Sequence, residues 1–142
     1  MVTNKKILDP NWLAGFASAE GSFGVDIFKS NTKSGFGVKI NFNITQHSRD
    51  KLLLESFKEY LGCGVIHSYK NNSIAYYRVN RLLDINCRIT PFFEKYPILG
   101  AKSLDYRDFC LVSRLMANRD HLTVKGLDEI RKIKGGMNTG RV

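Results

Sequence analysis

Glu20 is the residue whose type and position first suggest chemistry. It lies near the end of the segment Leu13 to Gly21, which reads LAGFASAEG and is predicted to be a helix. A carboxylate at the C-terminal end of a helix meets the negative end of the helix dipole, at a cost of about 0.3–1 kcal/mol. Glu20 therefore requires a nearby cation. A solvated glutamate at a fraying helix end is the alternative interpretation.

The helix that carries Glu20 has an unusual surface. At about 100° per residue, Trp12, Leu13 and Phe16 share one arc, and we expect this bulky face to pack on its own domain. The rest of the surface is made of small residues, namely Ala14, Gly15, Ala17, Ser18, Ala19 and Gly21. A face of small residues lets a second helix backbone approach closely. We therefore expect a contact with a second helix at Ala14, Gly15 and Ser18.

The composition points to a polyanionic partner. The chain has 142 residues, 22 Lys and Arg against 13 Asp and Glu, and a formal net charge of +9. This length predicts a single domain over residues 1–142, and the charge predicts DNA, RNA or an acidic lipid surface as partner. No apolar run approaches the ~20 residues needed to span a bilayer, and the N-terminus has no signal-peptide core. We expect a soluble protein that works without a membrane.

The cysteines and histidines do not form a recognisable metal site. Cys63, Cys87 and Cys110 are scattered without a CxxC pair, which suits structural thiols in a reducing compartment. The three histidines have no ligand spacing either. A zinc site is therefore not expected.

The order of the elements predicts an α+β fold. Asp9 is expected to cap the first helix, with Pro10 as its first residue. Period-two patterns predict strands at 22–28, 38–45, 65–69 and 74–79, with a helix at 49–61 between the pairs. Leu52, Leu53, Phe57 and Tyr60 share one side of that helix. Helices follow at 82–96 with a break at Pro91, at 103–117 and at 123–133. Residues 1–8 are expected to form a basic arm and residues 135–142 a loose tail.

This αββαββα order predicts a four-stranded antiparallel sheet with helices on one face. The first two strands turn Phe23, Val25 and Ile27, and then Val38, Ile40, Phe42 and Ile44, towards the core. The opposite face carries Lys, Asn, Tyr, Arg and Thr at alternate positions, which are side chains that read base edges in a major groove. A sheet face that is exposed only to water would also be polar. The net charge favours contact with nucleic acid, with Lys39, Asn43 and Arg78 as the expected readers of bases.

The helix sequence LAGFASAEG resembles the signature helix of the LAGLIDADG homing endonucleases, with Glu20 at the position of the acidic metal ligand and Ser18 where the family name has its first Asp. Further similar stretches are ITQH at 44–47 followed by Arg49-Asp50-Lys51, LGCG at 61–64, GAK at 100–102, and LDEIRKIK with MNTGR within 127–141. Together they resemble the C-terminal half of fungal single-chain enzymes with two signature helices. The resemblance implies a saddle-shaped sheet that lies over DNA.

The resemblance also implies a metal-dependent DNA endonuclease that hydrolyses phosphodiester bonds. Glu20 and the carbonyl of Ala19 would bind Mg²⁺, Gln46 would orient the attacking water, and Lys102 would stabilise charge at the phosphate. Mn²⁺ is expected to substitute, and Ca²⁺ is expected to support binding without cleavage. The DNA-binding residues would be Ser22, Gly24, Asp26, Phe28, Ser30, Lys39, Asn41, Asn43, Thr45, His67, Tyr69, Lys70, Tyr76, Arg78 and Asn80.

One signature helix implies a homodimer, because cleavage of both strands needs two acidic helix ends. The alternative is that the chain is an engineered or separated half of a two-motif enzyme, whose natural target would not be symmetric. A symmetric dimer would select a palindromic or near-palindromic double-stranded DNA target. The resemblance also implies that the protein is intron-encoded and mitochondrial. Two other functions remain open at this point: an intron-splicing maturase that binds RNA, and a transcription regulator that binds DNA without cleavage. Glu20 argues against both, because a pure binder needs no carboxylate beside a phosphate.

Overall fold

A computed structural model of the chain describes residues 9–68 and 73–138. The expected basic arm at 1–8, the turn residues Tyr69 and Lys70, and residues 139–142 lie outside the described residues. The regular elements are α1 (Pro10–Glu20), β1 (Gly21–Lys29), β2 (Phe36–His47), a 3₁₀ turn (Ser48–Asp50), α2 (Lys51–Leu61), β3 (Val65–Ser68), β4 (Ile74–Val79), α3 (Leu82–Asp84), a π-helical turn (Ile85–Ile89), α4 (Thr90–Lys95), α5 (Lys102–Ala117), a second 3₁₀ turn (Asp120–Leu122) and α6 (Val124–Gly135).

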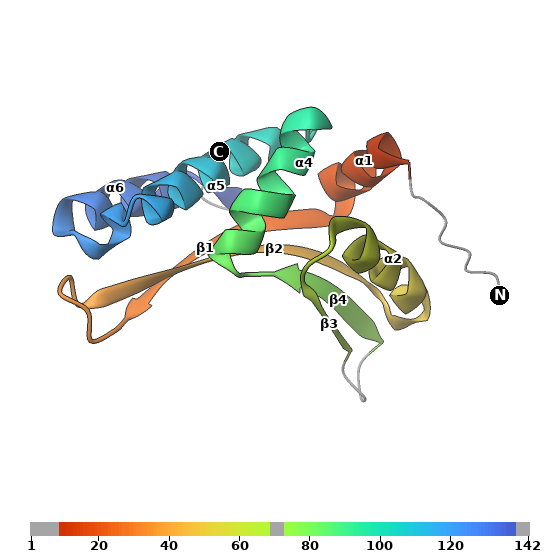
Figure 1. The fold of residues 1–142 in the computed structure, drawn as a ribbon, viewed down its shortest axis with the longest axis horizontal. Helices are drawn as coiled ribbons and strands as arrows, with labels where there is room; N and C mark the ends of the chain where they lie inside the picture. The colour runs from red at the N-terminus through yellow and green to blue at the C-terminus, as the bar shows by residue number, and fades with distance from the viewer. Residues whose placement is uncertain (1–8, 69–72, 139–142) are drawn as a thin grey trace.

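The strands form one antiparallel sheet in the order β1-β2-β4-β3. All the labelled helices lie on one side of it, and the sheet curves away from them so that its other face is on the inside of the curve (Figure 1). The predicted α+β fold with helices on one face is confirmed. We call the sheet face turned away from the helices the open face. Within the described residues it carries Ser22, Gly24, Asp26, Phe28, Gly37, Lys39, Asn41, Asn43, Thr45, His47, Val65, His67, Ile74, Tyr76 and Arg78.

The core lies between the sheet and the helices and is rich in aromatic rings. Phe23 of β1 stacks on Phe42 of β2, with ring centroids 5.1 Å apart. Phe93 of α4 and Phe109 of α5 contact the Phe23 ring from the helical side. Each of these four side chains is at most 1% exposed. The period-two alternation predicted the strand half of this core, Phe23 and Phe42, correctly because strand residues alternate between the two faces of a sheet.

The first helix begins and ends as the sequence predicts. Asp9 Oδ1 accepts a hydrogen bond from the Asn11 amide at 2.9 Å, and Pro10 occupies the first turn. At the other end the chain passes from helix to strand without a loop. A Cβ at Gly21 would lie 2.6 Å from the Ala17 carbonyl oxygen, so only glycine fits this corner. Gly21 thus places Glu20 directly beside the first residue of the sheet.

The second helix buries only part of the expected side: Phe57 is buried and Leu53 is half-buried as predicted. Leu54, Phe57 and Leu61 are buried, whereas Leu52 is 77% exposed and Tyr60 is exposed at the margin. The prediction for Leu52 and Tyr60 was therefore wrong. Three leucines in succession allow more than one apolar stripe, and the stripe that fits the sheet is the one through Leu54. The helix ends at Gly62 in the left-handed conformation, as expected.

The region before Pro91 also differs from the prediction. The expected break lies earlier, as a π-helical turn over Ile85–Ile89, and Pro91 sits inside the first turn of α4. Proline has no amide hydrogen and its ring clashes with the carbonyl of the preceding turn. A wider π turn before it removes the need for that hydrogen bond. The proline thus begins a helix here and does not end one.

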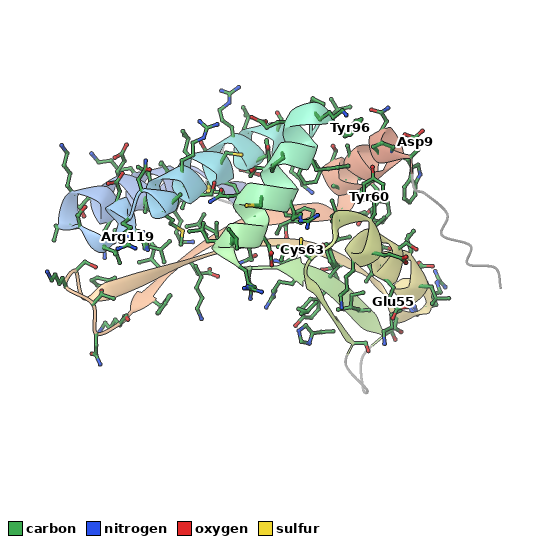
Figure 2. All side chains as sticks on the ribbon, in the orientation of Figure 1. Asp9, Glu55, Tyr60, Cys63, Tyr96 and Arg119 are labelled. Atoms are coloured by element: carbon green, nitrogen blue, oxygen red, sulfur yellow. The ribbon has the colours of Figure 1, made fainter. Side chains whose placement is uncertain are left out.

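The cysteines differ in their surroundings. Cys110 is buried, Cys63 is half-buried in the loop between α2 and β3 (Figure 2), and Cys87 is exposed, so the structural role expected for all three does not extend to Cys87. Burial raises the pKa of the Cys63 and Cys110 thiols. The carbonyl of Cys63 accepts a hydrogen bond from the Tyr77 hydroxyl at 2.6 Å. Tyr77 itself is fully buried, so this bond ties β4 to the loop after α2.

The first residues of the expected loose tail are packed. Gly135 ends α6, Met137 is 4% exposed, and the Asn138 side chain donates to the carbonyl of Phe23 at 3.0 Å. Asn138 also donates its backbone amide to Asp105 at 2.9 Å. The prediction was therefore wrong for 135–138. A buried methionine and an asparagine that closes on β1 hold this segment against the sheet.

Candidate functional site

The C-terminal end of α1 carries an acidic side chain, Glu20, and is contacted by a positively charged one, Lys102. Glu20 is exposed and is the last residue of the helix. Lys102, the first residue of α5, donates its Nζ to the Ala19 carbonyl at 3.3 Å and to the Gly21 carbonyl. The lysine therefore bonds to the residues on both sides of Glu20. Its positive charge lies at the negative end of the helix dipole, where it is stabilising.

Gln46 lies near the same end of α1 by the register of the sheet. Gly21, which follows Glu20, pairs with Ile44, and Gln46 lies two positions further along β2. Gln46 pairs with the buried Ala75 of β4 and is half-buried on the helical side of the sheet. The structure thus gathers the three expected catalytic residues at one end of the sheet. No hydrogen bond joins Gln46 to Glu20 or Lys102 among the described residues.

The donors at this end suit a hard divalent cation. The carboxylate of Glu20 and the carbonyl of Ala19 are both oxygen ligands, the kind that Mg²⁺ and Ca²⁺ prefer. A carbonyl oxygen has two lone pairs, so Ala19 can accept from Lys102 and still hold an ion. In the part of the chain that the structure describes, no group of three His, Cys, Asp or Glu side chains could hold a metal. A cation here would draw its other ligands from elsewhere.

The small face of α1 is partly used inside the chain. Ala14 and Ala17 are 4% and 0% exposed, so Ala14 has almost no surface to offer a second helix. Ala14 is therefore packed inside its own chain, and the expected contact of Ala14 with a second helix stays a prediction. Gly15 and Ala19 are exposed, and a Cβ at Gly15 would meet nothing within 4 Å. The open stripe of α1 consists of Asn11, Gly15 and Ala19, spaced by four residues.

Trp12 and Ser18 border this stripe. Trp12 is 46% exposed, although its ring stacks on Phe16 at 5.4 Å, so the expectation that it packs inward was only half right. Ser18 is half-buried: its Oγ donates to the Ala14 carbonyl and accepts from the Leu99 amide at 2.9 Å. Leu99 is 67% exposed and was not predicted. It lies in the loop before α5, which nothing in the local pattern links to α1.

The open face carries most of the residues expected to contact nucleic acid. Ser22, Asp26, Phe28, Lys39, Thr45 and His67 are exposed, and Asn80 is exposed just after β4. Gly24, Ser30, Asn41, Asn43, Tyr76 and Arg78 are half-buried. Ser30 belongs to the β1–β2 turn, where its amide donates to the Gly35 carbonyl at 3.0 Å. The side chains on this face can be followed on the inside of the curve in Figure 2.

One cluster on the open face combines an aromatic ring with a cation. The Phe28 ring covers Gly37, where a Cβ would lie 2.4 Å from it. Lys39 Nζ lies 4.9 Å from the centre of the same ring. Gly37 was not singled out from the sequence, although a glycine at an outward strand position often marks a close approach. The ring limits where the lysine charge can lie, which orients it outward from the sheet.

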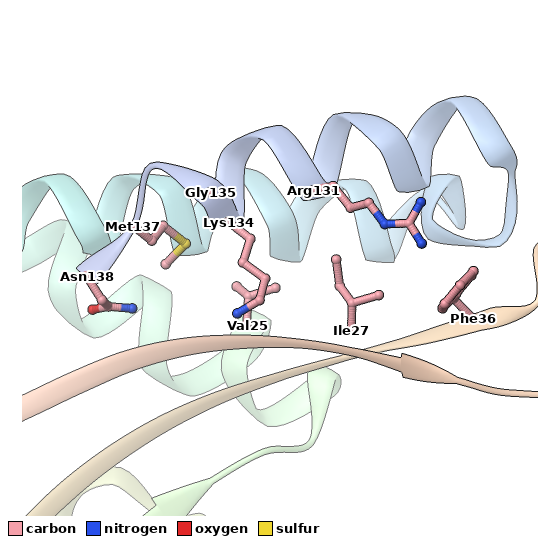
Figure 3. Close-up of a pocket in the computed structure, with 8 residues that line it drawn as sticks. All are labelled: Val25, Ile27, Phe36, Arg131, Lys134, Gly135, Met137 and Asn138. Atoms are coloured by element: carbon pink, nitrogen blue, oxygen red, sulfur yellow. The ribbon is translucent and has the colours of Figure 1, made fainter. Parts of the chain in front are cut away.

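A groove of about 700 Å³ lies away from this end of α1, between α6 and the distal half of β1 and β2 (Figure 3). Val25, Ile27 and Phe36 form its floor, and Arg131 and Lys134 reach over it from α6. The Arg131 guanidinium lies 4.5 Å from the centre of the Phe36 ring. None of Glu20, Gln46 and Lys102 lines this groove, so its volume does not identify the reactive site.

Comparison with known proteins gives a consistent result. The sequence profile of LAGLIDADG endonucleases matches residues 13–113. The "Probable intron-encoded endonuclease 3" of Neurospora crassa is 42% identical over 128 residues, which are 90% of this chain and 24% of that protein. The "Probable intron-encoded endonuclease 2" of the same fungus is 41% identical, over 89% of this chain and 27% of that protein.

Solved structures agree with the sequence relatives. The homing endonuclease I-SmaMI bound to cleaved DNA is 48% identical, with a TM-score of 0.93 over 100% of this chain and 48% of that chain. I-LtrWI bound to target DNA is 42% identical, with the same TM-score, over 100% of this chain and 47% of that chain. The chain thus spans about a quarter of the curated relatives and about half of the matched structures. No helix among the described residues is long and apolar enough to cross a membrane.

Proposed function

Because the chain belongs to the LAGLIDADG endonuclease family, we propose that it is a site-specific DNA endonuclease that hydrolyses phosphodiester bonds at the C-terminal end of α1. The observation that carries the proposal is the contact of Lys102 with the carbonyls on both sides of Glu20. Lys102 and Glu20 are far apart in sequence, yet α5 begins where α1 ends. A carboxylate and an ammonium group at the same helix end, next to a polar sheet face, suit a reaction on a phosphate.

Each residue at this end has a separate task. Glu20 and the Ala19 carbonyl would hold a divalent cation, with Mg²⁺ as the expected ion, Mn²⁺ as a substitute and Ca²⁺ as an ion that supports binding alone. When bound, such a cation neutralises phosphate charge and lowers the pKa of a water. Gln46 would orient the attacking water through its amide. Lys102 would donate to a phosphate oxygen and stabilise the charge that develops there.

The products follow from the direction of attack. The water attacks phosphorus, the bond from phosphorus to the 3′ oxygen breaks, and that oxygen takes up a proton. The fragments carry a 5′-phosphate and a 3′-hydroxyl. Since each cut needs one such helix end, cleavage of both strands requires two.

We propose that a second copy of the chain supplies the other helix end, through the open stripe of Asn11, Gly15 and Ala19. The stripe carries no large side chain, and Gly15 has free space above it, so two helices can approach closely there. Ser18 and Trp12 would border the contact. A two-fold symmetric dimer presents the same open face twice, and its target would be palindromic or nearly so.

The open face is proposed as the surface that lies on double-stranded DNA. Its curvature, its alternating polar side chains and the net charge of +9 support this assignment.

Two further relatives have names that mention introns: an ND4 intron 1 protein of Podospora anserina, 34% identical, and a cox1 intron-2 protein of Schizosaccharomyces pombe, 28% identical. An intron origin in a fungal mitochondrion is part of the proposal.

The test separates binding from chemistry at Glu20. The wild-type chain is incubated with Mg²⁺ and a library of random palindromic duplexes, and the cleaved molecules are sequenced to obtain the best site. Glu20→Gln keeps the size and hydrogen bonding of the side chain but removes its charge. We expect it to bind the selected site in Ca²⁺ as well as the wild type does, and to cleave it in Mg²⁺ several orders of magnitude more slowly.

Glu55→Gln is the matched control. Glu55 is an exposed carboxylate on α2 (Figure 2), so this variant makes the same chemical change away from the end of α1. It should cleave at the wild-type rate. Undiminished cleavage by the Glu20 variant would falsify the role of Glu20 as a metal ligand. A wild-type chain that selects a DNA site but never cuts it, with any divalent ion, would instead favour a protein that binds without cleavage.

A further inference from the structure

A row of hydrogen-bonded polar side chains crosses the open face from β1 to β4. Asn41 Nδ2 donates to Asp26 Oδ2 at 3.5 Å, and Asn43 Nδ2 donates to Asn41 Oδ1 at 2.5 Å. Arg78 Nε then donates to Asn43 Oδ1 at 2.8 Å. We call these residues, Asp26, Asn41, Asn43 and Arg78, the polar row. It joins three strands by side-chain contacts on the face proposed to meet DNA.

The backbone is built to accommodate the row. Gly24 of β1 pairs with Asn41, and a Cβ there would lie 2.8 Å from Asn41 Oδ1. The missing side chain leaves room for the Asn41 amide to turn along the strand towards Asn43. Asn43 pairs directly with Arg78 in the register of β2 and β4. The row therefore depends on the absence of a side chain at Gly24 and on the register between β2 and β4.

Arg78 is held at two points but keeps its reading end available. Its Nε is bonded to Asn43, and its guanidinium carbon lies 4.9 Å from the centre of the Tyr76 ring. Within the described residues, its terminal nitrogens donate to no protein acceptor. Two parallel N–H groups of a guanidinium match the O6 and N7 acceptors of guanine in a major groove. A fixed guanidinium plane suits this pairing better than a mobile one does.

Asn43 is placed differently from a residue that reads a base. To read adenine, an asparagine must accept from N6 and donate to N7 through the same amide. The Asn43 oxygen already accepts from Arg78, and its nitrogen already donates to Asn41. The amide keeps one lone pair and one hydrogen, so contact with adenine is not blocked, but the two bonds fix the orientation of the amide within the row. We therefore assign Asn43 a supporting role towards Arg78, in place of the base reading expected from the sequence.

We propose that Arg78 recognises a guanine in the major groove of the target, and that Asn43, itself held by Asn41, is a positioning residue for Arg78. The inference rests on the proposed function, because it assumes that the open face binds double-stranded DNA. It assigns the substrate a specific base at the position facing Arg78. It also separates the roles of two residues that were both expected to read bases: Arg78 contacts the base, and Asn43 acts through Arg78.

The test measures base preference at a single position. The site selected by the wild-type chain is resynthesised with each alternative base pair at every position, and binding is measured by competition in Ca²⁺. One guanine in each half-site should emerge whose replacement weakens binding about 5- to 150-fold, which corresponds to 1–3 kcal/mol at about 1.4 kcal/mol per tenfold. Arg78→Ala should lose this preference and leave the preferences at other positions intact. Arg78→Lys keeps the charge and should also lose most of it.

A second set of variants tests the positioning role. Asn43→Ala should weaken the preference for the same guanine, whereas Asn43→Asp, which keeps an acceptor for Arg78 Nε, should restore the preference even if total affinity falls. The double variant Asn43→Ala with Arg78→Ala should lose no more preference than Arg78→Ala alone. Lys125→Ala is the control: it removes a charge at an exposed position near the start of α6, away from the open face, and should keep the guanine preference. Melting curves of every variant verify that the fold is intact.

Three outcomes would overturn the inference. If Arg78→Ala weakens binding equally on every sequence, Arg78 contacts a phosphate and the base assignment is wrong, while the proposed endonuclease still stands. If Asn43→Ala removes an adenine preference at another position and spares the guanine, Asn43 reads a base itself. If the wild-type chain selects no DNA site at all, the proposed function fails together with the inference.

Discussion

Replacing Lys102 with methionine should affect stability and chemistry by different amounts, and both effects can be estimated from its contacts. The Lys102 side chain is half-buried, and its ammonium donates to the carbonyls of Ala19 and Gly21 at the end of α1. Methionine keeps the length and apolar character of the side chain but removes the charge and every donor. The perturbation is therefore confined to the contacts with these carbonyls and to whatever Lys102 donates to during the reaction.

The stability effect should be moderate. Hydrogen bonds from a charged group contribute about 1.5–3 kcal/mol when protected from water, and a cation at a helix C-terminus about 0.3–1 kcal/mol. Solvent reaches the Ala19 carbonyl, which reduces both values. We expect a total loss of about 1–2 kcal/mol. With an unfolding entropy of about 2.1 cal/mol/K per residue over 142 residues, the melting temperature should fall by about 3–7 °C.

The chemical effect should be much larger. A donor that stabilises charge in a transition state is typically worth about 100- to 1,000-fold in rate. Cleavage of the selected site in Mg²⁺ should therefore slow by about this factor, while binding in Ca²⁺ changes little. The assay compares melting curves, binding and single-turnover cleavage of the variant with those of the wild type. Lys125→Met, at an exposed position near the start of α6, makes the same change away from α1.

The stability part of the reasoning is refuted if Lys102→Met melts at the same temperature as the wild type. The contacts with the two carbonyls would then contribute nothing measurable. The chemical part is refuted if the variant cleaves as fast as Lys125→Met does. A variant that loses binding and cleavage in equal proportion would make Lys102 a contact for the uncleaved DNA.

Three further predictions follow from other contacts. Gly15→Leu should leave the fold of one chain intact, because nothing lies within 4 Å of its Cβ, and should abolish association of chains in sedimentation experiments; a wild-type chain that is monomeric at micromolar concentration contradicts the dimer. Tyr77→Phe should lower the free energy of unfolding in urea by about 1–2 kcal/mol, since it leaves the Cys63 carbonyl without its 2.6 Å donor. Burial lowers the pKa of His121 from 6.5, with Asp120 opposing in part, so the folded state binds fewer protons than the unfolded state. The free energy of unfolding should therefore decrease as the pH falls below about 6.5, and His121→Gln should flatten that dependence in melts between pH 5 and 8.

The sheet could be predicted from the sequence because its two faces differ so clearly. Alternation of Phe23, Val25 and Ile27 with polar residues can be satisfied by only one register of burial. The structure confirms β4 at Ile74–Val79 with the bounds expected from the pattern. Helix faces were less predictable. Consecutive leucines in α2 permit several apolar stripes, and the correct one depends on the sheet beneath it.

The small face of α1 shows a limit of a different kind. Ala14 and Gly15 have nearly the same size, so the sequence cannot say which one the chain buries and which one it leaves exposed. The loop before α5 decides this, because the Leu99 amide bonds to Ser18 and fixes the orientation of the helix. The contact of Lys102 with the carbonyls on both sides of Glu20 also comes from tertiary structure. The resemblance assigned Lys102 and Glu20 to the same site, whereas no local pattern in the residues themselves could have done so.

The polar row was out of reach for a related reason. Each of its members was correctly expected on the open face, since period two assigns faces. Which of them bond to one another depends on the offset between β2 and β4, and a shift of one residue would turn Asn43 away from Arg78. The position of Gly24 opposite Asn41 is the one trace of this arrangement in the sequence. It is informative only once the pairing of β1 with β2 is known.

The direct passage from α1 into β1 joins the proposed chemistry to the proposed recognition. Glu20 ends the helix, Gly21 begins the strand, and no loop residue separates them. The carboxylate therefore has a fixed position relative to the open face, and the sheet in turn has a fixed position on DNA when Arg78 engages its guanine. Binding in the wrong register would move the base away from Arg78 and the phosphate away from Glu20 together. If the junction between α1 and β1 at Gly21 were made flexible, the position of the cut should therefore become less precise, while the DNA sequence that is bound should stay the same.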